Sequence, residues 1–392
     1  MGDGATPSAI VVVGASLAGL RAVERLRRRG YEGAITWIGA ESARPYDRPP
    51  LSKQLLRGEW DPARVALKTS YDVLAADLRL GRRAVSLDVR ERRVTLDDGA
   101  RIPYDGCVIA TGATARTLPG SEKVQGVHTL RTMEDALAIR SALAKKPRVA
   151  VVGAGFIGLE VAASCRALGL EVTVIETAGV PLGTVLGDAV GESIRAFHED
   201  HGVRFRTATS VVGIAGDRAV EGLHLSDGTT VPAELVVVGI GVTPETAWLE
   251  GSGIAVDRGV LTDAACRTNV PGVVACGDVA RSYNPLFDET LRVEHWTNAV
   301  EQANAAVTAL LGGDAPASPS VPYFWSDQYD AKIQFAGRIA KTDALEVLEG
   351  SIAEKNLVAI YGRAGKLRGV LAVNKPAALI RYRRAIGEGA AV

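Results

Sequence analysis

The stretch from Arg148 to Glu176 constrains the fold of this chain more than any other part of the sequence. It reads RVAVVGAGFIGLE and continues to EVTVIE. The apolar run Val149–Val152 is typical of a buried parallel strand, and the following residues predict a helix over Phe156–Leu168. A second strand is expected at Val172–Ile175. Strand, turn, helix and strand in this order predict a βαβ unit.

Three glycines in the turn of this unit have the G-x-G-x-x-G spacing of a dinucleotide-binding site. Gly153 permits the tight turn, Gly155 lets backbone N–H groups approach a pyrophosphate, and Gly158 allows close helix–strand packing. The helix begins with its positive dipole end toward the phosphates. Glu176 suits a ribose 2′-hydroxyl and repels a 2′-phosphate. Because the range Thr177–Gly187 contains no Lys or Arg, the unit predicts NADH rather than NADPH.

A second unit of the same kind lies near the beginning of the chain. The apolar run Ala9–Val13 is followed by GASLAG at Gly14–Gly19, by a helix expected to about Arg29 and by a strand expected at Ala34–Ile38. Ser16 stands where the second glycine belongs, but serine is small enough for its N–H to approach a phosphate. An ordinary α/β turn without a ligand is the alternative, and two such units in one chain argue against coincidence.

Composition excludes several classes of function. The chain has 392 residues, which predicts two or three domains. Lys+Arg and Asp+Glu both number 45, which argues against nucleic acid or an anionic membrane as the main partner. Met1–Ser8 has no basic segment followed by an apolar one, and no window approaches a membrane span. We therefore expect a cytoplasmic protein with no nucleic-acid or membrane partner.

The cysteines argue against metal and disulfide chemistry. The chain has four of them, and no two stand in C-x-x-C spacing. A disulfide framework or a zinc site is therefore not expected, and we predict no metal site. The four are Cys107, Cys165, Cys266 and Cys276.

A proline-rich loop, RPYDRPPLSK at Arg44–Lys53, follows the first unit. Its prolines stiffen the backbone, and Ser52 is expected to cap a following helix. Lys53 has two interpretations. Composition alone favours a solvated surface lysine, whereas its place after the rigid turn favours contact with a cofactor that lies over the sheet edge.

Further elements follow in order. An acid after a strand-end glycine, as in Gly277-Asp278, suits ribityl-type hydroxyls, with a helix N-cap as the alternative. The predicted elements are hairpin strands over Arg82–Leu96 with a turn at Asp97–Gly99, a buried strand at Cys107–Thr111 ending at Gly112, a helix at Met133–Lys145, hairpins and a last strand over Gly202–Val238, and a short strand at Val273–Cys276.

The pattern changes after Gly312–Pro322, which is rich in Gly, Pro, Ser and Ala. Tyr323–Tyr329 is an aromatic cluster in a chain that is only 5% aromatic, and it is either core or the wall of a cofactor site. A small α+β domain is expected from here on. Its predicted elements are successive antiparallel strands at Lys332–Gly337, Leu345–Leu348, Leu357–Tyr361 and Leu367–Val373, and a helix at about Pro376–Ile386.

With these residues in view, the chain closely resembles the FAD-dependent ferredoxin reductase family over nearly its whole length. The most specific marker is PYDRPPLSK at Pro45–Lys53. The other markers are Ala110-Thr111-Gly112, Leu130-Arg131-Thr132, Gly153–Glu160, Gly277-Asp278, Glu294-His295-Trp296 and Phe324-Trp325-Ser326-Asp327-Gln328.

The resemblance implies an α/β fold with two Rossmann-like nucleotide-binding domains, in which the NAD domain is inserted into the FAD domain, and a small C-terminal α+β interface domain. The expected boundaries are 1–115 and 246–320 for the FAD domain, 116–245 for the NAD domain and 321–392 for the interface domain. The implied cofactors are FAD and NADH.

Motifs and resemblance together predict the site residues. At the position where the family has an acid that contacts the adenosine ribose, this chain has Ala40. Either Glu41, one position later, substitutes for that acid or the contact is lost. The predicted FAD contacts are Gly14, Ser16, Ala18, Gly19, Glu41, Arg48, Lys53, Ala84, Thr111, Gly112, Arg131, Asp278 and Trp296. The predicted NAD contacts are Gly153, Gly155, Phe156, Ile157, Gly158, Glu160, Glu176 and Gly241.

The resemblance also implies a catalytic pair, Lys53 and Glu160, buried beside the flavin. Lys53 would stabilise the negative charge that develops as a hydride arrives from NADH, and Glu160 would hold Lys53 in place. A surface helix glutamate is the alternative for Glu160.

Without two adjacent thiols for disulfide chemistry, electrons should pass outward to another protein. The resemblance implies that this protein is a small [2Fe-2S]-type ferredoxin, or another iron–sulfur protein, which receives single electrons and feeds a monooxygenase or dioxygenase. Arginines on the last helix are candidates for steering an acidic ferredoxin, or form a solvated helix face. A rubredoxin reductase, a redox-sensing flavoprotein like apoptosis-inducing factor, and peroxide chemistry at Cys276 are the alternatives. The arginines are Arg381, Arg383 and Arg384.

Overall fold

The structure is a computed structural model that describes residues 7–313 and 320–392. The described chain forms two compact units. The first comprises Met1–Asp47, Ala66–Thr114 and Thr243–Tyr323, and the second comprises Arg48–Val65, Ala115–Val242 and Phe324–Val392. The expected division into three domains stays a prediction. Parts of two sequence expectations, residues 1–6 of Met1–Ser8 and residues 314–319 of Gly312–Pro322, lie outside the described residues.

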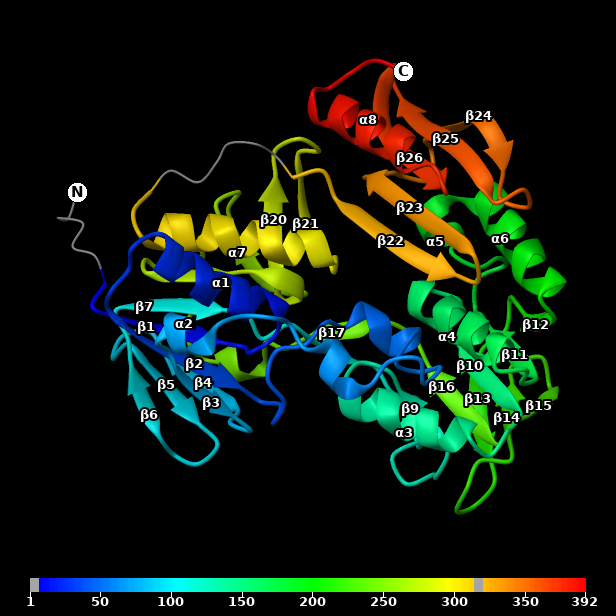
Figure 1. Ribbon diagram of the computed structural model, residues 1–392, viewed down its shortest axis with the longest axis horizontal. Helices are drawn as coiled ribbons and strands as arrows, with labels where there is room; N and C mark the ends of the chain where they lie inside the picture. The colour runs from blue at the N-terminus through cyan, green and yellow to red at the C-terminus, as the bar shows by residue number, and fades with distance from the viewer. Residues whose placement is uncertain (1–6, 314–319) are drawn as a thin grey trace. The chain divides into compact units, whose positions relative to one another are not determined.

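A parallel five-stranded sheet forms the core of the first unit, with the strand order β19-β7-β1-β2-β3. After Ala9, its central strand β1 is a run of β-branched residues that are buried on both faces, as the sequence predicts. Helices α1 and α7 pack against each other on one face of this sheet (Figure 1). The elements are β1 (Ala9–Val13), α1 (Leu17–Arg28), β2 (Ala34–Gly39), α2 (Tyr71–Leu74), β3 (Asp77–Leu80), β7 (Gly106–Ile109), β19 (Val273–Ala275) and α7 (Trp296–Leu310).

Two smaller three-stranded sheets complete the first unit. The predicted hairpin is confirmed, because β4 pairs antiparallel with β5, and a third strand that the sequence pattern missed, β6, extends the sheet. The elements are β4 (Ala84–Asp88), β5 (Arg93–Leu96), β6 (Arg101–Pro103), β18 (Val260–Thr262), β20 (Ala280–Asn284), β21 (Glu289–Arg292) and the 3₁₀ helices η3 (Ala247–Leu249) and η4 (Gly277–Val279). The chain passes between the units at β8 (Ala113–Ala115) and β17 (Val242–Pro244).

The second unit contains another parallel five-stranded sheet, with the order β12-β11-β10-β16-β9. Strands β10 and β11 occupy the predicted residues, and helix α4 ends one residue before the predicted Leu168. Hairpins were expected over Gly202–Val238. That is correct for β13–β15 and wrong for β12, which pairs in parallel with β11.

These elements of the second unit have the following bounds. They are η1 (Pro49–Ser52), η2 (Pro62–Val65), β9 (Val127–Thr129), α3 (Met133–Leu143), β10 (Val149–Val152), α4 (Phe156–Ala167), β11 (Val172–Ile175), α5 (Gly183–Leu186), α6 (Asp188–Asp200), β12 (Val203–Arg206), β13 (Val211–Ala215), β14 (Gly222–Leu225), β15 (Thr230–Pro232) and β16 (Leu235–Val238).

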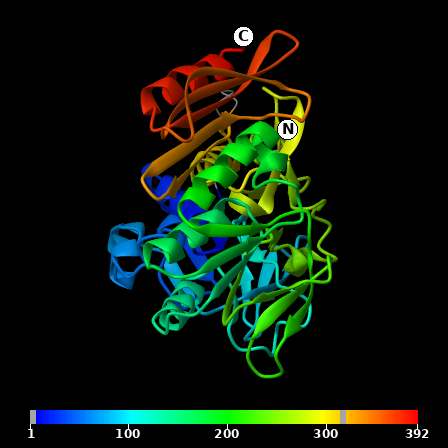
Figure 2. The same ribbon diagram turned by 90° about the vertical axis from the view of Figure 1, so that its right-hand side faces the viewer.

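The C-terminal part is an antiparallel sheet with the order β22-β23-β26-β25-β24, and α8 packs on it (Figure 2). The expected strands are present, but they are not neighbours in simple succession, because β26 lies between β23 and β25. The aromatic cluster is itself the first strand of the sheet. The elements are β22 (Tyr323–Gln328), β23 (Ala331–Gly337), β24 (Ala344–Ser351), β25 (Asn356–Arg363), β26 (Lys366–Val373) and α8 (Pro376–Gly387).

The predicted fold class is therefore confirmed: two Rossmann-like α/β sheets and a C-terminal α+β part. In the described ranges, no helix combines the length and the apolar composition needed to cross a bilayer.

Candidate active site

The two glycine-rich turns have the same backbone construction. Gly14 has φ +121° and Gly153 has φ +101°, a region that only glycine adopts easily. A Cβ at Gly14 would lie 2.0 Å from the Ala110 carbonyl oxygen, and a Cβ at Gly153 would lie 2.4 Å from the Gly239 oxygen. Each turn thus runs directly against the neighbouring strand's end, which leaves no room for a side chain.

The third glycine of each fingerprint serves packing of the helix on its own turn. A Cβ at Gly19 would lie 1.8 Å from the Gly14 oxygen, and one at Gly158 would lie 2.0 Å from the Gly153 oxygen. The sequence assigned this role to Gly158, and the geometry agrees.

The second position differs, and the structure explains why Ser16 is acceptable there. Gly155 has an extended conformation with ψ 178°, and its Cβ would meet no atom within 4 Å. Ser16 has a similar extended conformation and makes no side-chain capping bond to its helix. The protein itself therefore does not require glycine at this position.

The two βαβ units differ in the residue at the end of their second strand. The first glycine of each fingerprint donates its N–H to a carbonyl near the end of that strand. Gly14 donates to Ile38 of β2, and Gly153 donates to Ile175 of β11, both at 2.8 Å. Glu176 and Gly39 therefore hold equivalent positions. Glu176 accepts a 2.7 Å hydrogen bond from the Ala154 N–H and a 2.8 Å bond from the Ala178 N–H, which fix its carboxylate beside the turn.

The first unit has no acid at that equivalent position. A Cβ at Gly39 would lie 2.5 Å from the Cβ of Ala15, so only glycine fits there. Glu41 follows two residues later, and its carboxylate accepts a hydrogen bond from the Tyr46 hydroxyl. Whether Glu41 also contacts a ribose stays a prediction.

The other predicted residues of the first unit lie mostly at the carboxyl edge of its sheet, where nucleotides bind in open α/β sheets. Thr111 and Gly112 follow β7, and Asp278 follows β19 in η4. A Cβ at Gly277 would lie 2.9 Å from the Cβ of Ala18, so this edge packs directly on α1. Trp296 lies at the start of α7. Ala84 is the exception, at the start of β4 in the small antiparallel sheet.

Three predicted FAD residues, Arg48, Lys53 and Arg131, belong to the second unit. Arg48 donates from Nη1 to the Arg131 carbonyl at 2.5 Å, and the Arg131 N–H donates to Asp135 at 2.8 Å. Of the predicted NAD residues, Gly241 follows β16 at φ +96°. Phe156 and Ile157 open α4 beside the turn.

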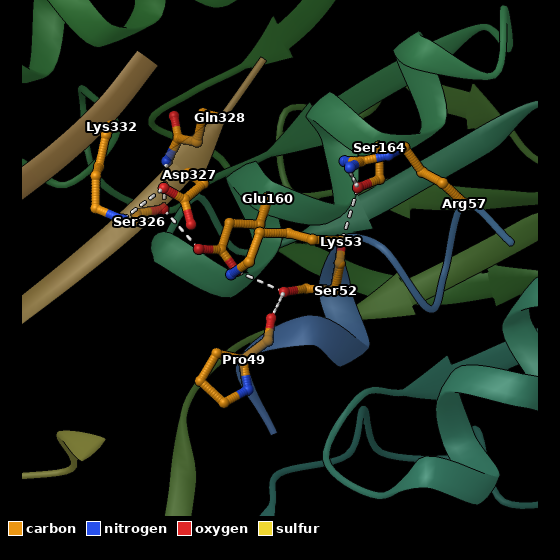
Figure 3. Close-up of polar contacts among 10 residues, drawn as sticks. All are labelled: Pro49, Ser52, Lys53, Arg57, Glu160, Ser164, Ser326, Asp327, Gln328 and Lys332. Atoms are coloured by element: carbon orange, nitrogen blue, oxygen red, sulfur yellow. Dashed lines mark hydrogen bonds and ion pairs between the residues drawn. The ribbon is translucent and has the colours of Figure 1, made fainter. Parts of the chain in front are cut away.

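The structure brings Lys53 and Glu160 together in a buried ion pair, with 2.9 Å between Nζ and Oε2 (Figure 3). Lys53 is 4% exposed and Glu160 5%, so the interpretations as a surface lysine and a surface helix glutamate are both wrong. The backbone beside Lys53 is docked on the same face of α4, because the Ser164 hydroxyl donates to the Ser52 carbonyl at 2.7 Å. Water does not screen this pair, so its field acts over a longer range than that of a surface pair.

The expectation that Ser52 caps a helix is wrong. Ser52 is the last residue of η1, and its hydroxyl donates to Glu160 Oε2 at 2.5 Å. A second serine, Ser326 on β22, donates to Glu160 Oε1 at 2.8 Å. Both oxygens of the carboxylate are therefore occupied by donors, as a buried charge requires.

Sequence reasoning missed three contributors to the site region. Ser326 and Gln328 lie on one face of β22, and their i, i+2 spacing is the signal in the sequence that could have identified them. Arg206, at the end of β12, lies beside Glu176, whose N–H donates to the Arg206 carbonyl at 2.8 Å. The sequence around Glu176 does not point to Arg206, because the two positions become neighbours only through the parallel pairing of β11 with β12.

The four cysteines are all buried and free. Burial raises the pKa of Cys107 to about 12, and burial with the neighbouring Cys266 raises the pKa of Cys276 further above its ordinary value. The thiolate, which is the reactive form, is therefore disfavoured at each position. The described residues include no group of three His, Cys, Asp or Glu side chains that could hold a metal ion.

The residues present fit FAD and NAD(H). Neither α1 nor α4 has an acidic residue in its first turn, and neither has a side-chain cap at its N-terminus. The N–H groups at the N-termini of these two helices can therefore bind phosphate oxygens. Each turn faces the point in its sheet where the strand order reverses, between β1 and β7 or between β10 and β16. Two such nucleotide sheets with a buried lysine–glutamate pair define a two-nucleotide oxidoreductase.

Comparison with known proteins identifies the family. Residues 8–303 match the pyridine nucleotide-disulphide oxidoreductases, and residues 323–392 match the reductase C-terminal domain. The ferredoxin–NAD(+) reductase component of the anthranilate 1,2-dioxygenase system of Burkholderia cepacia is 38% identical over 97% of this chain and 94% of its own. Rhodocoxin reductase of Rhodococcus erythropolis is 39% identical over 94% of this chain and 86% of its own.

A solved structure agrees. In the crystal structure of a covalent putidaredoxin reductase–putidaredoxin complex, the matching chain has a TM-score of 0.93 and 33% identity, covering 97% of this chain and 93% of that one. This chain therefore belongs to the pyridine nucleotide-disulphide oxidoreductases, in the family of the ferredoxin–NAD(+) reductases, and its cofactors are FAD and NADH.

Substitution by serine at two glycines of the NAD fingerprint should affect the stability of the protein differently. Gly158→Ser should lower the free energy of unfolding by about 1–3 kcal/mol, because its Cβ must displace the Gly153 carbonyl. Gly155→Ser copies Ser16 of the first unit and should leave stability unchanged. Chemical denaturation of the two purified variants measures this. Equal destabilisation by both would contradict the assignment of the two roles.

Proposed function

We propose that this chain is an NADH-dependent ferredoxin reductase, which takes a hydride from NADH and passes single electrons to a small [2Fe-2S]-type ferredoxin of a monooxygenase or dioxygenase system. The observation that carries the proposal is the buried Lys53–Glu160 pair beside the NAD fingerprint. The relative from Burkholderia cepacia, named as the reductase component of a dioxygenase system, and the putidaredoxin complex support the choice of acceptor.

Bound FAD supplies the chemistry that converts a two-electron donation into single-electron steps. The chain's own contribution is electrostatic. Lys53 presents a fixed ammonium in a site from which water is excluded, where it stabilises negative charge that develops during hydride transfer. Glu160 holds that ammonium in one place, and its helix α4 begins at the turn that binds the pyrophosphate of NADH.

The cysteines favour an external electron acceptor. A disulfide reductase needs two adjacent thiols, and no two cysteines of this chain are in C-x-x-C spacing. Peroxide chemistry at Cys276 needs a thiolate, which burial disfavours. Electrons therefore leave for another protein.

We place the ferredoxin-steering role on the arginines of α8. Arg381 stacks its guanidinium 4.5 Å from the Tyr382 ring centre, and Arg384 donates to Glu388 at 2.7 Å. Arg384 is thus partly neutralised by Glu388, and the three arginines together make this helix rich in positive charge. We also propose a cytoplasmic location, since four cysteines that are unpaired in the structure fit a reducing compartment.

Anaerobic stopped-flow reduction tests the function. NADH should bleach the visible flavin absorbance of the purified holoprotein, and a [2Fe-2S] ferredoxin should then reoxidise it rapidly in single-electron steps. Rubredoxin is the second acceptor to assay, and faster turnover with it would favour a rubredoxin reductase. Slow turnover with every acceptor and a long-lived reduced complex would favour a redox sensor like apoptosis-inducing factor. Protein without FAD, or flavin that NADH does not bleach, would refute the proposal.

Lys53→Met should slow hydride transfer by about 10²–10³-fold, because it removes the ammonium that stabilises developing charge. It also leaves Glu160 buried without its partner, which costs about 3–5 kcal/mol of stability. The double variant Lys53→Met/Glu160→Gln removes both charges and should be as slow while regaining stability. Limiting rates at saturating NADH measure the effect.

A matched control for this prediction is Lys355→Met. Lys355 forms an exposed ion pair with Asp330 at 2.5 Å, and such pairs contribute at most about 1 kcal/mol. Its limiting rate should equal that of the unaltered protein. A normal rate for Lys53→Met would remove Lys53 from the mechanism.

Glu176 should set the choice of coenzyme. We expect kcat/KM to be higher for NADH than for NADPH, by about 10–100-fold, since a charged hydrogen bond contributes about 1.5–3 kcal/mol. Glu176→Ser should lower kcat/KM for NADH and raise it for NADPH, because Arg206 remains at the neighbouring strand end. The control is Glu171→Ser, at the opposite end of β11, which should leave the ratio unchanged. A preference for NADPH in the unaltered protein would overturn this role.

A further inference from the structure

A line of buried hydrogen bonds continues beyond the Lys53–Glu160 pair. Ser326 donates to Glu160 and accepts from Gln328 Nε2 at 3.0 Å. Gln328 Oε1 lies 2.8 Å from Nε2 of His198 on α6. The hydroxyl of Tyr329 lies 3.1 Å from His198 Nδ1. Ser326, Gln328 and His198 are all fully buried, with 0% exposure.

The donors in this line point in one direction. Gln328 uses its NH₂ group on Ser326, so its oxygen must accept, and His198 must carry its proton on Nε2. Nδ1 of His198 then accepts from the Tyr329 hydroxyl. The order of donation is thus Tyr329, His198, Gln328, Ser326 and finally Glu160, whose charged carboxylate is the strongest acceptor and terminates the line.

This direction determines where the Ser326 proton points. A serine hydroxyl has one proton, which rotates to whichever acceptor is available. Because Gln328 turns its NH₂ group, which cannot accept, toward Ser326, the hydroxyl proton is left for Glu160. With the amide of Gln328 reversed, Ser326 would donate to the amide oxygen instead, and Glu160 Oε1 would lose its donor.

The far end of the line is also held in a defined geometry. Burial lowers the pKa of His198 to about 4, so the imidazole is neutral at pH 7 and has one donor and one acceptor. Tyr329 has φ +54°, a conformation that bulky residues rarely adopt. Its ring stacks on His201, with 3.7 Å between the ring centres and an angle of 15°. The strained backbone and the stack together hold the Tyr329 hydroxyl at His198.

We propose that Gln328 and His198 are positioning residues for hydride transfer: through Ser326 they fix the orientation of the Glu160 carboxylate, and through it the position of the Lys53 ammonium. The inference rests on the proposed role of Lys53. It assigns a function in the reaction to a helix, α6, and a strand, β22, that contribute no predicted nucleotide contact. Neither Gln328 nor His198 touches the reacting atoms in this account.

Two variants with little change of shape test the inference in the holoprotein. Gln328→Glu keeps the size, and at a pH high enough to ionise the buried carboxyl it replaces the amide donor with an acceptor, so that Ser326 donates away from Glu160. Ser326→Ala removes the donor itself. Both should lower the limiting rate of flavin reduction by about 10–100-fold, the usual effect of a misplaced catalytic group, while half-saturation with NADH changes less than about twofold.

A pair of tyrosines provides the matched control. Tyr329→Phe removes the hydroxyl bonded to His198, and the limiting rate should fall, though less than in Ser326→Ala. Tyr361→Phe removes another buried hydroxyl of the same unit, which donates to the Leu186 carbonyl at 2.7 Å outside the line. Its limiting rate should be that of the unaltered protein. An equal effect of both changes would indicate general loosening and would overturn the inference.

The outcomes separate this inference from the proposed function. Normal limiting rates in both Gln328→Glu and Ser326→Ala, with a slow Lys53→Met, would refute the positioning role alone. A normal rate in Lys53→Met would refute the role of the pair on which the inference rests. A parallel loss of rate in Lys53→Met, Gln328→Glu and Ser326→Ala, with unchanged half-saturation, supports the inference.

Discussion

The second unit depends on one buried charge, the carboxylate of Glu160. Taking a carboxylate and an ammonium out of water costs several kcal/mol per ion unless every lone pair and proton finds a partner. Here the partners come from segments far apart in the sequence: Ser52 at the end of η1 and Lys53 directly after it, and Ser326 from β22. The chain must therefore bring η1, α4 and β22 together before this charge is satisfied. The ion pair thus makes the geometry of the unit specific, whatever its net contribution to stability.

The two nucleotide-binding βαβ units have the same backbone conformation in their glycine-rich turns but suit different ligands. Both turns run against the neighbouring strand end, and both third glycines pack on the carbonyl of the first. What differs is the residue after the second strand. A Cβ at Gly39 would clash with Ala15, whereas the carboxylate of the equivalent Glu176 accepts hydrogen bonds from the N–H of Ala154 in the turn and from the N–H of Ala178. The chemical distinction between the sites therefore lies in side chains at the sheet edge, on a shared backbone.

Much of the fold could be predicted from sequence, because apolar runs and glycines carry local information. Strands β10 and β11 begin and end at the predicted residues for that reason. Strand β22 could not be predicted from an apolar run, because its fully buried positions are the polar residues Ser326 and Gln328. Polar residues that face inward give no hydrophobic alternation, and their partners are set by tertiary packing alone. Ser52 failed for the same reason: its hydroxyl bonds a carboxylate far along the chain, not a local helix.

The inward polar face of β22 has a physical rationale once its partners are known. An apolar strand would bury more favourably, since each polar side chain there must give up its water. In this line every donor meets an acceptor, from the Tyr329 hydroxyl to Glu160, and each bond polarises the next in a low-dielectric interior. A half-satisfied line would be worse than an apolar core, because a buried donor or acceptor without a partner keeps its full desolvation cost. The unbroken sequence of bonds from His198 on α6 to Glu160 on α4 is the physical basis of the positioning role proposed for this histidine.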